Sequence, residues 1–416
     1  MALAGGEALD NVTSTMNLVS LNIESIQLGH PLPFVLRGAD GVLLAQKGYV
    51  IRTREELAKM VGRGRQLCVD TDESGDSHRA YLAQLQRMLI ADTNLGEIAA
   101  MKMTAADDAG GRGRTGKTLP DWPELQLRAT QLLRAPSPAD FGGRFQTLHD
   151  ELARHCEQTP DATLLGLIYL SAQETRMYSA THSMLVCCVC MVVAREMLRW
   201  PASRVQQLGH AALSMNIAMS ELQDQLAQQT HPLTAQQIAA VESHAERSEA
   251  LLRTLGVADP VWLEAVRCHH HRTPGPLAKK TEPQQMARLL QRADIFGARM
   301  APRAARLPMP VTAAMQASYY DEEHQVDEAG AALVKTLGVY PPGAFVRLAS
   351  QEVGVVVRRG TTATTPKVAV VTNRDGMPTG EPIPRDTGMP PWKVTGVVAF
   401  KDVRVKLSLD RLLNLV

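Results

Sequence analysis

The chain has 416 residues, a length that predicts two or three domains, one of them with a substantial core. Its 44 Lys and Arg residues nearly balance 43 Asp and Glu residues, which argues against general nucleic-acid binding. Six cysteines without disulfide-like spacing indicate a reducing cytoplasm. The N-terminus lacks signal-peptide features, and the longest apolar run, Met184 to Ala194, is too short to cross a bilayer, so we expect a soluble cytoplasmic protein with no membrane span.

Residues 1–75 are predicted to form a small β-rich domain, because short apolar runs alternate there with His-Pro and glycine turns. One helix is expected inside it, Arg54 to Gly62. A second helix, roughly His78 to Met101, leads into a flexible linker, so that residues 76–122 are interpreted as helix and linker. The linker contains a Gly-x-Gly-x-x-Gly sequence, but a dinucleotide-binding fingerprint needs a strand before it and a helix after it, and neither is evident.

Residues 123–349 are predicted to be all-helical, because apolar residues recur there at intervals of three and four. The expected helices include Phe141 to Cys156, Thr163 to Tyr178, and Met184 to Leu198. Residues 350–416 contain β-branched runs separated by Gly, Pro and Thr, which predict a short β tail closed by the helix Leu409 to Leu415. The expected fold is therefore mainly α, a helical bundle with a small β unit at each end.

Histidines at wide spacing are the candidate functional residues of the helical region. The set comprises His182 at the start of an apolar helix, His244, the run His269-His270-His271, and Asp294 in a later helix. Imidazole and carboxylate together suit Zn, Fe or Mn, and side chains from facing helices of a bundle can converge on one metal centre. Spacing does not prove convergence, since a single buried histidine is more often a hydrogen-bonded core residue.

The order of these segments resembles the HD-GYP family over roughly Ala172 to Leu348. The matching segments are Thr181-His182-Ser183, the helix HAALSMNIAM, His231-Pro232-Leu233-Thr234, His244, Cys268-His269-His270-His271-Arg272, Arg292-Ala293-Asp294, and Val339-Tyr340-Pro341-Pro342-Gly343. Each segment alone would match many proteins, whereas seven segments in the same order make the resemblance to the family specific. The resemblance implies an HD-type helical domain and an association with cyclic di-GMP hydrolysis.

The departures from the family lie at the residues that do the chemistry. Met215 and Asn216 stand where the family has its His-Asp pair, and Met219 stands where it has a lysine. The family's aspartate is expected to bridge two metals, whereas Asn offers a neutral carbonyl and Met only a soft thioether. The Gly-Tyr-Pro signature is missing as well. The resemblance therefore implies a degenerate member with no confident catalytic residue.

The resemblance also implies metal ligands and a residue that contacts the substrate. The metal ligands would be His182, His244, His269, His270 and Asp294, with one or two Fe or Mn ions held weakly or not at all. Arg303 falls near the family's phosphate-contacting arginine, although a solvated charge at a helix end is an equal alternative.

Three functional hypotheses follow from these residues. The first is an impaired signalling domain that acts by binding cyclic di-GMP or another signalling protein. The second is an active phosphodiesterase with a rearranged metal site, in which residues such as Glu174, His210 or His271 replace the lost ligands. The third is a purely structural scaffold that binds no nucleotide.

Two further patterns have a simpler interpretation as core packing. Cys187-Cys188-Val189-Cys190 contains Cys-x-x-Cys, but it lies in a continuous apolar stretch without a second Cys/His pair at zinc spacing. The methionines of this region are likewise expected in the core; they are Met184, Met191, Met197, Met215 and Met219.

Overall fold

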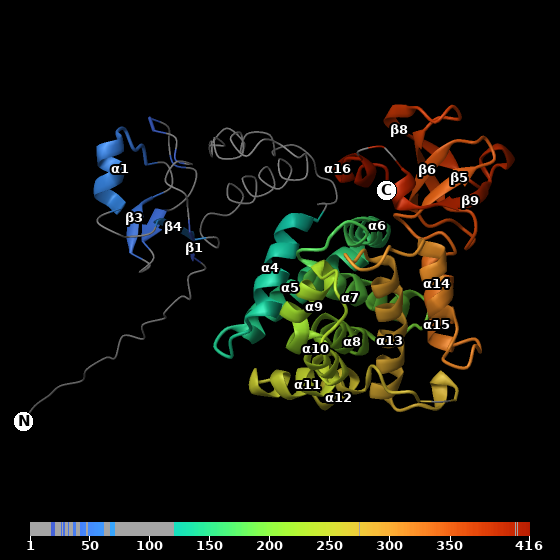
Figure 1. The fold of residues 1–416 in the computed structure, drawn as a ribbon, viewed down its shortest axis with the longest axis horizontal. Coiled ribbons are helices and arrows are strands. Elements are labelled where there is room, and N and C mark those ends of the chain that lie inside the picture. Colours follow the sequence, from blue (N-terminus) through green and yellow to red (C-terminus); the bar gives the residue numbers. More distant parts are fainter. Residues whose placement is uncertain are drawn as a thin grey trace, which may run out of the picture. The chain divides into compact units, whose positions relative to one another are not determined.

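The computed structural model describes residues 18–20, 26, 28–29, 32, 36–38, 42–46, 49–61, 67–70, 120–273, 275–403, 405 and 407–416. The chain divides into two compact units, Met1–Gly116 and Lys117–Val416 (Figure 1). The helix expected at His78 to Met101 and most of the expected linker lie outside the described residues. The two units are described separately below.

The first unit contains a small antiparallel sheet and one helix. Its elements are β1 (Leu18–Ser20), β2 (Leu36–Gly38), β3 (Leu43–Ala45), α1 (Arg54–Val61) and β4 (Leu67–Asp70). The strand order is β1-β4-β2-β3, and apolar side chains such as Leu36, Ile51 and Leu67 form its core. The predicted β-rich N-terminal domain is thus confirmed, and its helix begins at the expected residue, Arg54, while the expected last residue, Gly62, lies outside the described residues.

The second unit begins with a bundle of helices, as the apolar periodicity predicted. They are α4 (Trp122–Arg134), α5 (Phe141–Gln158), α6 (Pro160–Ser171), α7 (Tyr178–Glu196), α8 (Ala202–Ser214), α9 (Ser220–Gln228), α10 (Ala235–Glu242), α11 (His244–Thr254), α12 (Pro260–Cys268), α13 (Glu282–Met300), α14 (Val311–Tyr319) and α15 (Glu328–Leu337). Short 3₁₀ helices lie at Ile217–Met219 and Leu277–Lys279. Local sequence sets several starts, since Asp121, Asp259 and Asp327 accept backbone N–H groups at the first turns of α4, α12 and α15.

Helix α7 runs through the middle of the bundle and packs against α4, α5, α6, α8 and α13 (Figure 1). Every residue from Tyr178 to Ala194 is buried, including Cys187, Cys188 and Cys190, whose pKa values burial raises. By length and composition α7 is apolar enough to cross a membrane. However, 94% of its apolar window is buried inside the unit, as in the core helix of a globular protein.

One predicted helix is two helices in the structure. The run Thr163 to Tyr178 was expected to be continuous, but α6 ends at Ser171 and α7 begins at Tyr178. The Glu174 carboxylate accepts the backbone N–H groups of Arg176 and Met177, which stabilises the turn between them. As a result His182 lies about one turn inside α7 instead of at its start.

A five-stranded antiparallel sheet follows the helices. Its elements are β5 (Phe345–Leu348), β6 (Val353–Arg358), β7 (Lys367–Thr372), β8 (Pro378–Asp386) and β9 (Val394–Val398), with 3₁₀ helices at Pro390–Trp392 and Phe400–Asp402 and the short helix α16 (Leu409–Leu413) after it. The strand order is β8-β7-β6-β5-β9. The predicted β-rich C-terminal region is confirmed, and its first strand already starts at Phe345.

The alternation of side chains along these strands divides the sheet into two apolar faces. Phe345, Val355 and Ala369 pair across β5, β6 and β7 and belong to the main helical core. Val346 and Val368, which alternate with them, belong to a second small core on the other face. The sheet is therefore an integral layer of the second unit.

Candidate metal centre

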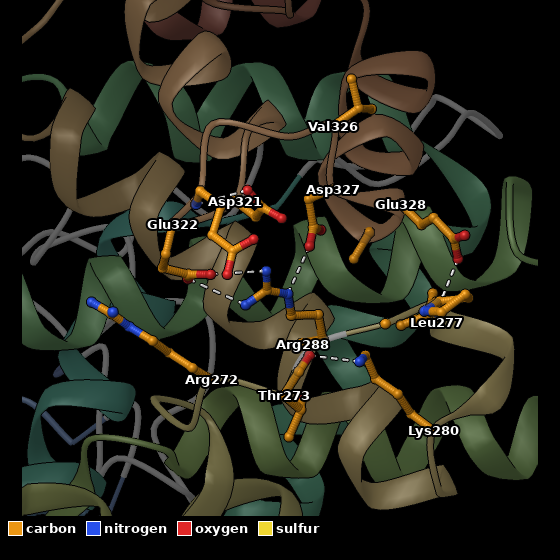
Figure 2. Close-up of a pocket in the computed structure, with 14 residues that line it drawn as sticks. Arg272, Thr273, Leu277, Lys280, Arg288, Asp321, Glu322, Val326, Asp327 and Glu328 are labelled. Carbon is orange, nitrogen blue, oxygen red and sulfur yellow. Dashed lines mark hydrogen bonds and ion pairs between the residues drawn. The ribbon is translucent and has the colours of Figure 1, made fainter.

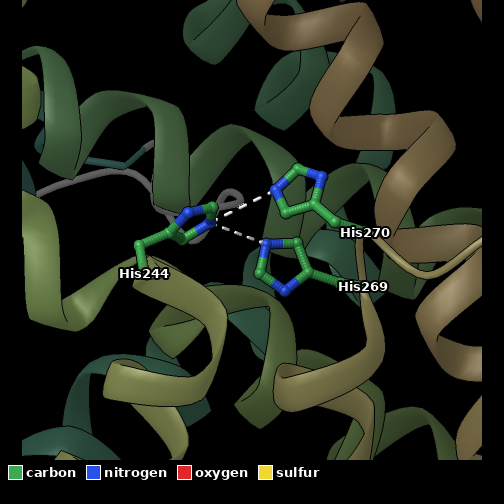
Figure 3. A group of neighbouring side chains, drawn as sticks. All are labelled: His244, His269 and His270. Carbon is green, nitrogen blue, oxygen red and sulfur yellow. Dashed lines mark hydrogen bonds between the residues drawn. The ribbon is translucent and has the colours of Figure 1, made fainter. Parts of the chain in front are cut away.

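Three of the predicted ligands meet at the ends of two neighbouring helices. His244 is the first residue of α11, His269 is the C-cap of α12, and His270 follows it. The Nε2 atom of His244 lies 3.1 Å from Nε2 of His269 and 3.2 Å from Nε2 of His270 (Figure 3). Among the described residues, these three form the one group of three or more potential ligands whose ligand atoms all lie within 4.8 Å of one another. We call these three residues the histidine triad.

Backbone hydrogen bonds set the proton positions in two of the three rings. His244 Nδ1 lies 2.5 Å from the Val241 carbonyl oxygen, and His269 Nδ1 lies 2.5 Å from the Val266 carbonyl oxygen. A carbonyl only accepts, so each Nδ1 carries a hydrogen and each neutral ring presents an unprotonated Nε2. This is the usual support of a histidine that ligates a metal, with one nitrogen fixed by the protein and the other left for the ion.

Burial keeps the inner part of the triad neutral. His244 and His269 are buried, whereas His270 is exposed to solvent. Burial, together with the neighbouring imidazoles His270 and His244, lowers the pKa of His269 to about 3. Burial also lowers the pKa of His244. The rings of His244 and His269 are thus in the neutral form that binds metal ions near neutral pH.

The other two predicted ligands contact each other. Nε2 of His182, on α7, lies 2.7 Å from Oδ1 of Asp294, on α13, and both side chains are largely buried. Burial alone would raise the pKa of Asp294, but the hydrogen bond from His182 and the nearby His270 and His269 hold it well below its usual range. Asp294 therefore carries a negative charge next to the histidine triad.

Arg303, the predicted phosphate-contacting residue, reaches this pair through a tyrosine. A guanidinium nitrogen of Arg303 donates to the Tyr178 hydroxyl at 3.1 Å, and the guanidinium carbon lies 5.3 Å from the Tyr178 ring centroid. The Tyr178 ring in turn stacks on His182, with centroids 5.6 Å apart and planes 8° apart. Tyr178 was not among the predicted site residues. Its position one turn before His182 on α7 was the signal that sequence reasoning missed.

The residues predicted to stand at the family's His-Asp and lysine positions are buried and neutral. Met215 is the C-cap of α8, Asn216 follows it, and Met219 ends the 3₁₀ helix that packs against α11. The Asn216 side chain is 3% exposed, and its Oδ1 atom has no hydrogen-bond partner among the described residues. These positions thus add one unpaired amide oxygen and no charge.

The replacement ligands considered for a rearranged site lie elsewhere. Glu174 caps the turn before α7, and His271 is exposed and outside the triad. His210 on α8 packs instead against His149 of α5, with ring centroids 4.3 Å apart, in a cluster with Phe145 and Trp262. Sequence reasoning did not detect this histidine pair, because the two rings come from helices far apart in the chain.

A cavity of about 400 Å³ opens between the loop that follows the triad and the segment from Asp321 to Ala329. Figure 2 shows Arg288 in its wall, between Glu322 and Asp327. Arg288 Nε lies 2.7 Å from Asp327 Oδ2, and its Nη2 lies 3.1 Å from Glu322 Oε2. Arg288 is thus paired with two of the carboxylates that line the cavity, and these contacts hold the segment against α13.

The donor set fits a metal ion. Nε2 atoms 3.1 to 3.2 Å apart match the spacing of neighbouring ligands on one ion bound at about 2.0–2.2 Å. Imidazole nitrogen suits Zn, Fe, Cu or Ni, and no described carboxylate joins the triad. When bound, such an ion would supply a Lewis acid and a site for water or an anion. The protein would supply the neutral rings, their fixed orientation and the adjacent Asp294 charge.

Comparison with known proteins gives the class to which these features correspond. No family model matches the chain. A cyclic di-GMP phosphodiesterase of Pseudomonas aeruginosa is 27% identical over 242 residues, which cover 56% of this chain and 58% of that protein's length. A solved structure, described as a HDG"Y"P protein from Bdellovibrio bacteriovorus, is 15% identical with a TM-score of 0.43, covering 76% of this chain and 98% of that one.

Fold and sequence agree on the class of the molecule. The second unit is a helical domain with a β-rich C-terminal region, and several predicted ligands converge in it. The match to the phosphodiesterase confirms that the chain resembles the HD-GYP family. The assignment of individual ligands, the loss of the His-Asp pair as a functional change, and the division of the chain at residues 75, 122 and 349 stay predictions.

Proposed function

We propose that this chain is a degenerate HD-GYP-domain protein of cyclic di-GMP signalling, impaired in catalysis, which acts by binding the nucleotide or a partner signalling protein in the cytoplasm. The observation that supports the proposal is the neutral, buried pair Met215-Asn216, which directly precedes the 3₁₀ helix that packs against α11. The motif order predicts that this pair stands where the family has His-Asp. Hydrolysis by two metals uses a bridging carboxylate to hold both ions and the nucleophilic water. Without it, the site keeps groups that bind but loses those that activate water.

Turnover and binding should be measured on the same protein. The full chain is purified without chelator or nickel affinity, supplemented with Fe(II) or Mn(II), and assayed for cyclic di-GMP hydrolysis and for equilibrium binding. We expect binding without measurable turnover. Two metal ions per chain with turnover that disappears in His269→Ala would overturn the proposal in favour of an active enzyme. Absence of both nucleotide and protein binding would leave only a structural role.

Restoring the family residues gives a sharper test of the reason for impairment. The double variant Met215→His with Asn216→Asp reintroduces an imidazole and a carboxylate at two buried positions. If their loss is the cause, this variant should gain a second bound metal and measurable hydrolysis. The matched control is Met215→Gln with Asn216→Gln, which adds polar side chains without the carboxylate and should stay inactive. Equal activity of the restored and control variants would contradict the proposed cause.

A further inference from the structure

The cavity beside Arg288 is separate from the predicted metal ligands, because neither the histidine triad nor His182 and Asp294 line it. Its volume of about 400 Å³ lies in the range of pockets that hold small molecules. One wall is the loop from Arg272 to Lys280, and the other is the segment from Asp321 to Ala329 (Figure 2). The charges on these two walls indicate what the cavity can bind.

The inner wall of the cavity is a balanced network of ion pairs. The buried Arg288 guanidinium lies 2.7 Å from Asp327 Oδ2 and 3.1 Å from Glu322 Oε2. Arg292, which does not line the cavity, lies 2.7 Å from the other Glu322 oxygen. Burial alone would raise the pKa of Glu322, but hydrogen bonds from Arg288 and the charge of Arg292 lower it to about 2. Two arginines thus balance two carboxylates, and this wall offers no free cation to an anionic ligand.

Outside this network, acidic side chains outnumber basic ones on the walls of the cavity. The Lys280 ammonium donates to the Thr273 carbonyl oxygen at 2.6 Å, which directs it toward its own loop. The remaining charged residues of the lining are three acids, Asp321, Glu323 and Glu328, and two bases, Arg272 and Lys280. This balance favours a cationic ligand over an anionic one.

The three remaining carboxylates keep oxygen atoms that can accept further hydrogen bonds. Glu328 Oε2 accepts the Leu277 backbone N–H at 2.7 Å, and Asp321 Oδ1 accepts the backbone N–H groups of Glu323 and Gln325 at 2.9 and 2.7 Å. In both side chains the second oxygen has no donor among the described residues. The Glu323 carboxylate has no partner in the described part of the chain. The cavity thus presents acceptors that a ligand can use.

These acceptors suit an organic cation better than a metal ion. Among the described residues, the histidine triad is the one group of three or more potential ligands whose ligand atoms lie within 4.8 Å of one another, so the carboxylates of the cavity are too far apart to surround one ion. A guanidinium or ammonium group donates several N–H groups in different directions. Leu277 on one wall and the half-exposed Val326 on the other provide apolar surface for an alkyl chain.

We propose that this cavity binds an organic cation, a guanidinium or primary ammonium group on an alkyl chain, with the carboxylates of Asp321, Glu323 and Glu328 as its acceptors. A free small molecule and an arginine or lysine side chain of a partner protein present the same chemistry. The site does not involve cyclic di-GMP or the histidine triad, so its test is independent of the function proposed above.

Calorimetric titration of the full chain tests the proposal. Agmatine, a butyl chain with a guanidinium group at one end and an ammonium group at the other, is the probe for a free cation. The peptide Ala-Arg-Ala with blocked ends represents the arginine of a partner protein. We expect one site per chain. Tighter binding of agmatine assigns the site to a free cation, and tighter binding of the peptide assigns it to a partner's side chain.

An anion with a similar alkyl chain is the control ligand. Hexanoate should not bind, because the lining carries an excess of carboxylates. Hexanoate binding as tight as that of the cations would overturn the proposal. So would the absence of binding by both agmatine and the peptide at millimolar concentrations.

Two variants locate the binding in the cavity. Glu323→Gln removes an exposed carboxylate and should weaken binding of the cation about fivefold. Val326→Arg adds a cation to a side chain that is 54% exposed at the cavity, where it should compete with the ligand. The matched controls are Glu381→Gln in β8 and Met377→Arg just before it, both at exposed positions.

The control variants should bind agmatine and the peptide like the unmodified chain, and urea unfolding checks that all four variants fold. Equal weakening in a variant and its control would show binding by general surface charge and overturn the proposal. Unchanged binding in both Glu323→Gln and Val326→Arg would overturn it as well.

Discussion

The pair of contacting histidines outside the metal centre, His149 and His210, should make the second unit sensitive to acid. His210 lies against His149, Phe145 and Trp262, with its Nε2 buried and without a hydrogen-bond partner among the described residues. Burial, together with the neighbouring His149, lowers the pKa of His210 to about 4. In the unfolded chain the same imidazole titrates near pH 6.5.

The sign of the effect follows from proton binding. Between about pH 6.5 and pH 4 the unfolded chain binds a proton at His210 that the folded chain does not, so acid favours unfolding. The contribution is fully present above about pH 6.5 and is lost as the pH falls toward 4. A shift of roughly 2.5 units corresponds to about 3 kcal/mol over the whole range, of which about 2 kcal/mol is lost between pH 7.5 and pH 5.

Urea unfolding at about pH 7.5 and pH 5 checks this magnitude. Tryptophan fluorescence reports on the second unit alone, because all four tryptophans lie within Lys117–Val416. His210→Phe keeps an aromatic ring in the cluster and should reduce the acid-induced loss of stability by about 2 kcal/mol. His231→Phe, at an exposed histidine, is the control and should keep the loss of the unmodified chain. An equal loss in His210→Phe and the unmodified chain would refute the reasoning.

Two further substitutions test packing in the second unit. Gly209→Ala should lower the free energy of unfolding by about 1–3 kcal/mol, because a methyl group there overlaps the His149 ring. Its control is Gly143→Ala, where no atom lies near the added methyl group, and this variant should be neutral or stabilising in the same urea experiment. Arg359→Met should lower the free energy of unfolding by about 2 kcal/mol in thermal or urea unfolding, since it leaves two partly buried carboxylates, on α6 and α7, without their cation. Its control, Arg374→Met at an exposed site, should change the free energy of unfolding by less than about 0.5 kcal/mol. Equal effects within either pair would contradict the packing argument.

The type of each element, helix or strand, could be predicted because the spacing of apolar residues can be read from the sequence without knowing which elements pack together. The residues at which the elements begin and end were harder to predict. The turn between α6 and α7 contains neither Gly nor Pro, and it depends on the Glu174 carboxylate bonding two nearby N–H groups, which periodicity does not reveal. The start of α4 at Trp122 did have a signal in the sequence, because Asp121 caps the helix and Pro123 follows within its first turn. Met197, predicted in the core, is 42% exposed because it lies at the C-cap of α7.

The candidate site was predictable as a list of residues and not as an arrangement. Motif order placed His244, His269 and His270 among the ligands, and the structure brings them together. Whether His182 and Asp294 contact the triad or each other depends on how α7 and α13 pack, which one sequence does not contain. The link from Arg303 to His182 through Tyr178 arises from the same packing.

The return of the chain's last helix to the bundle bears on how the second unit folds. Leu412 and Leu413 of α16 belong to the same core as Trp122 at the start of α4, and α16 packs on α6. Strand β5 likewise lies between β6 and β9, so its second neighbour is synthesised about fifty residues later. Contacts between such distant segments close large loops and form slowly. We expect the helices to stay loosely packed during synthesis until residues 394–413 emerge, so that interruption within the sheet would yield an aggregation-prone intermediate.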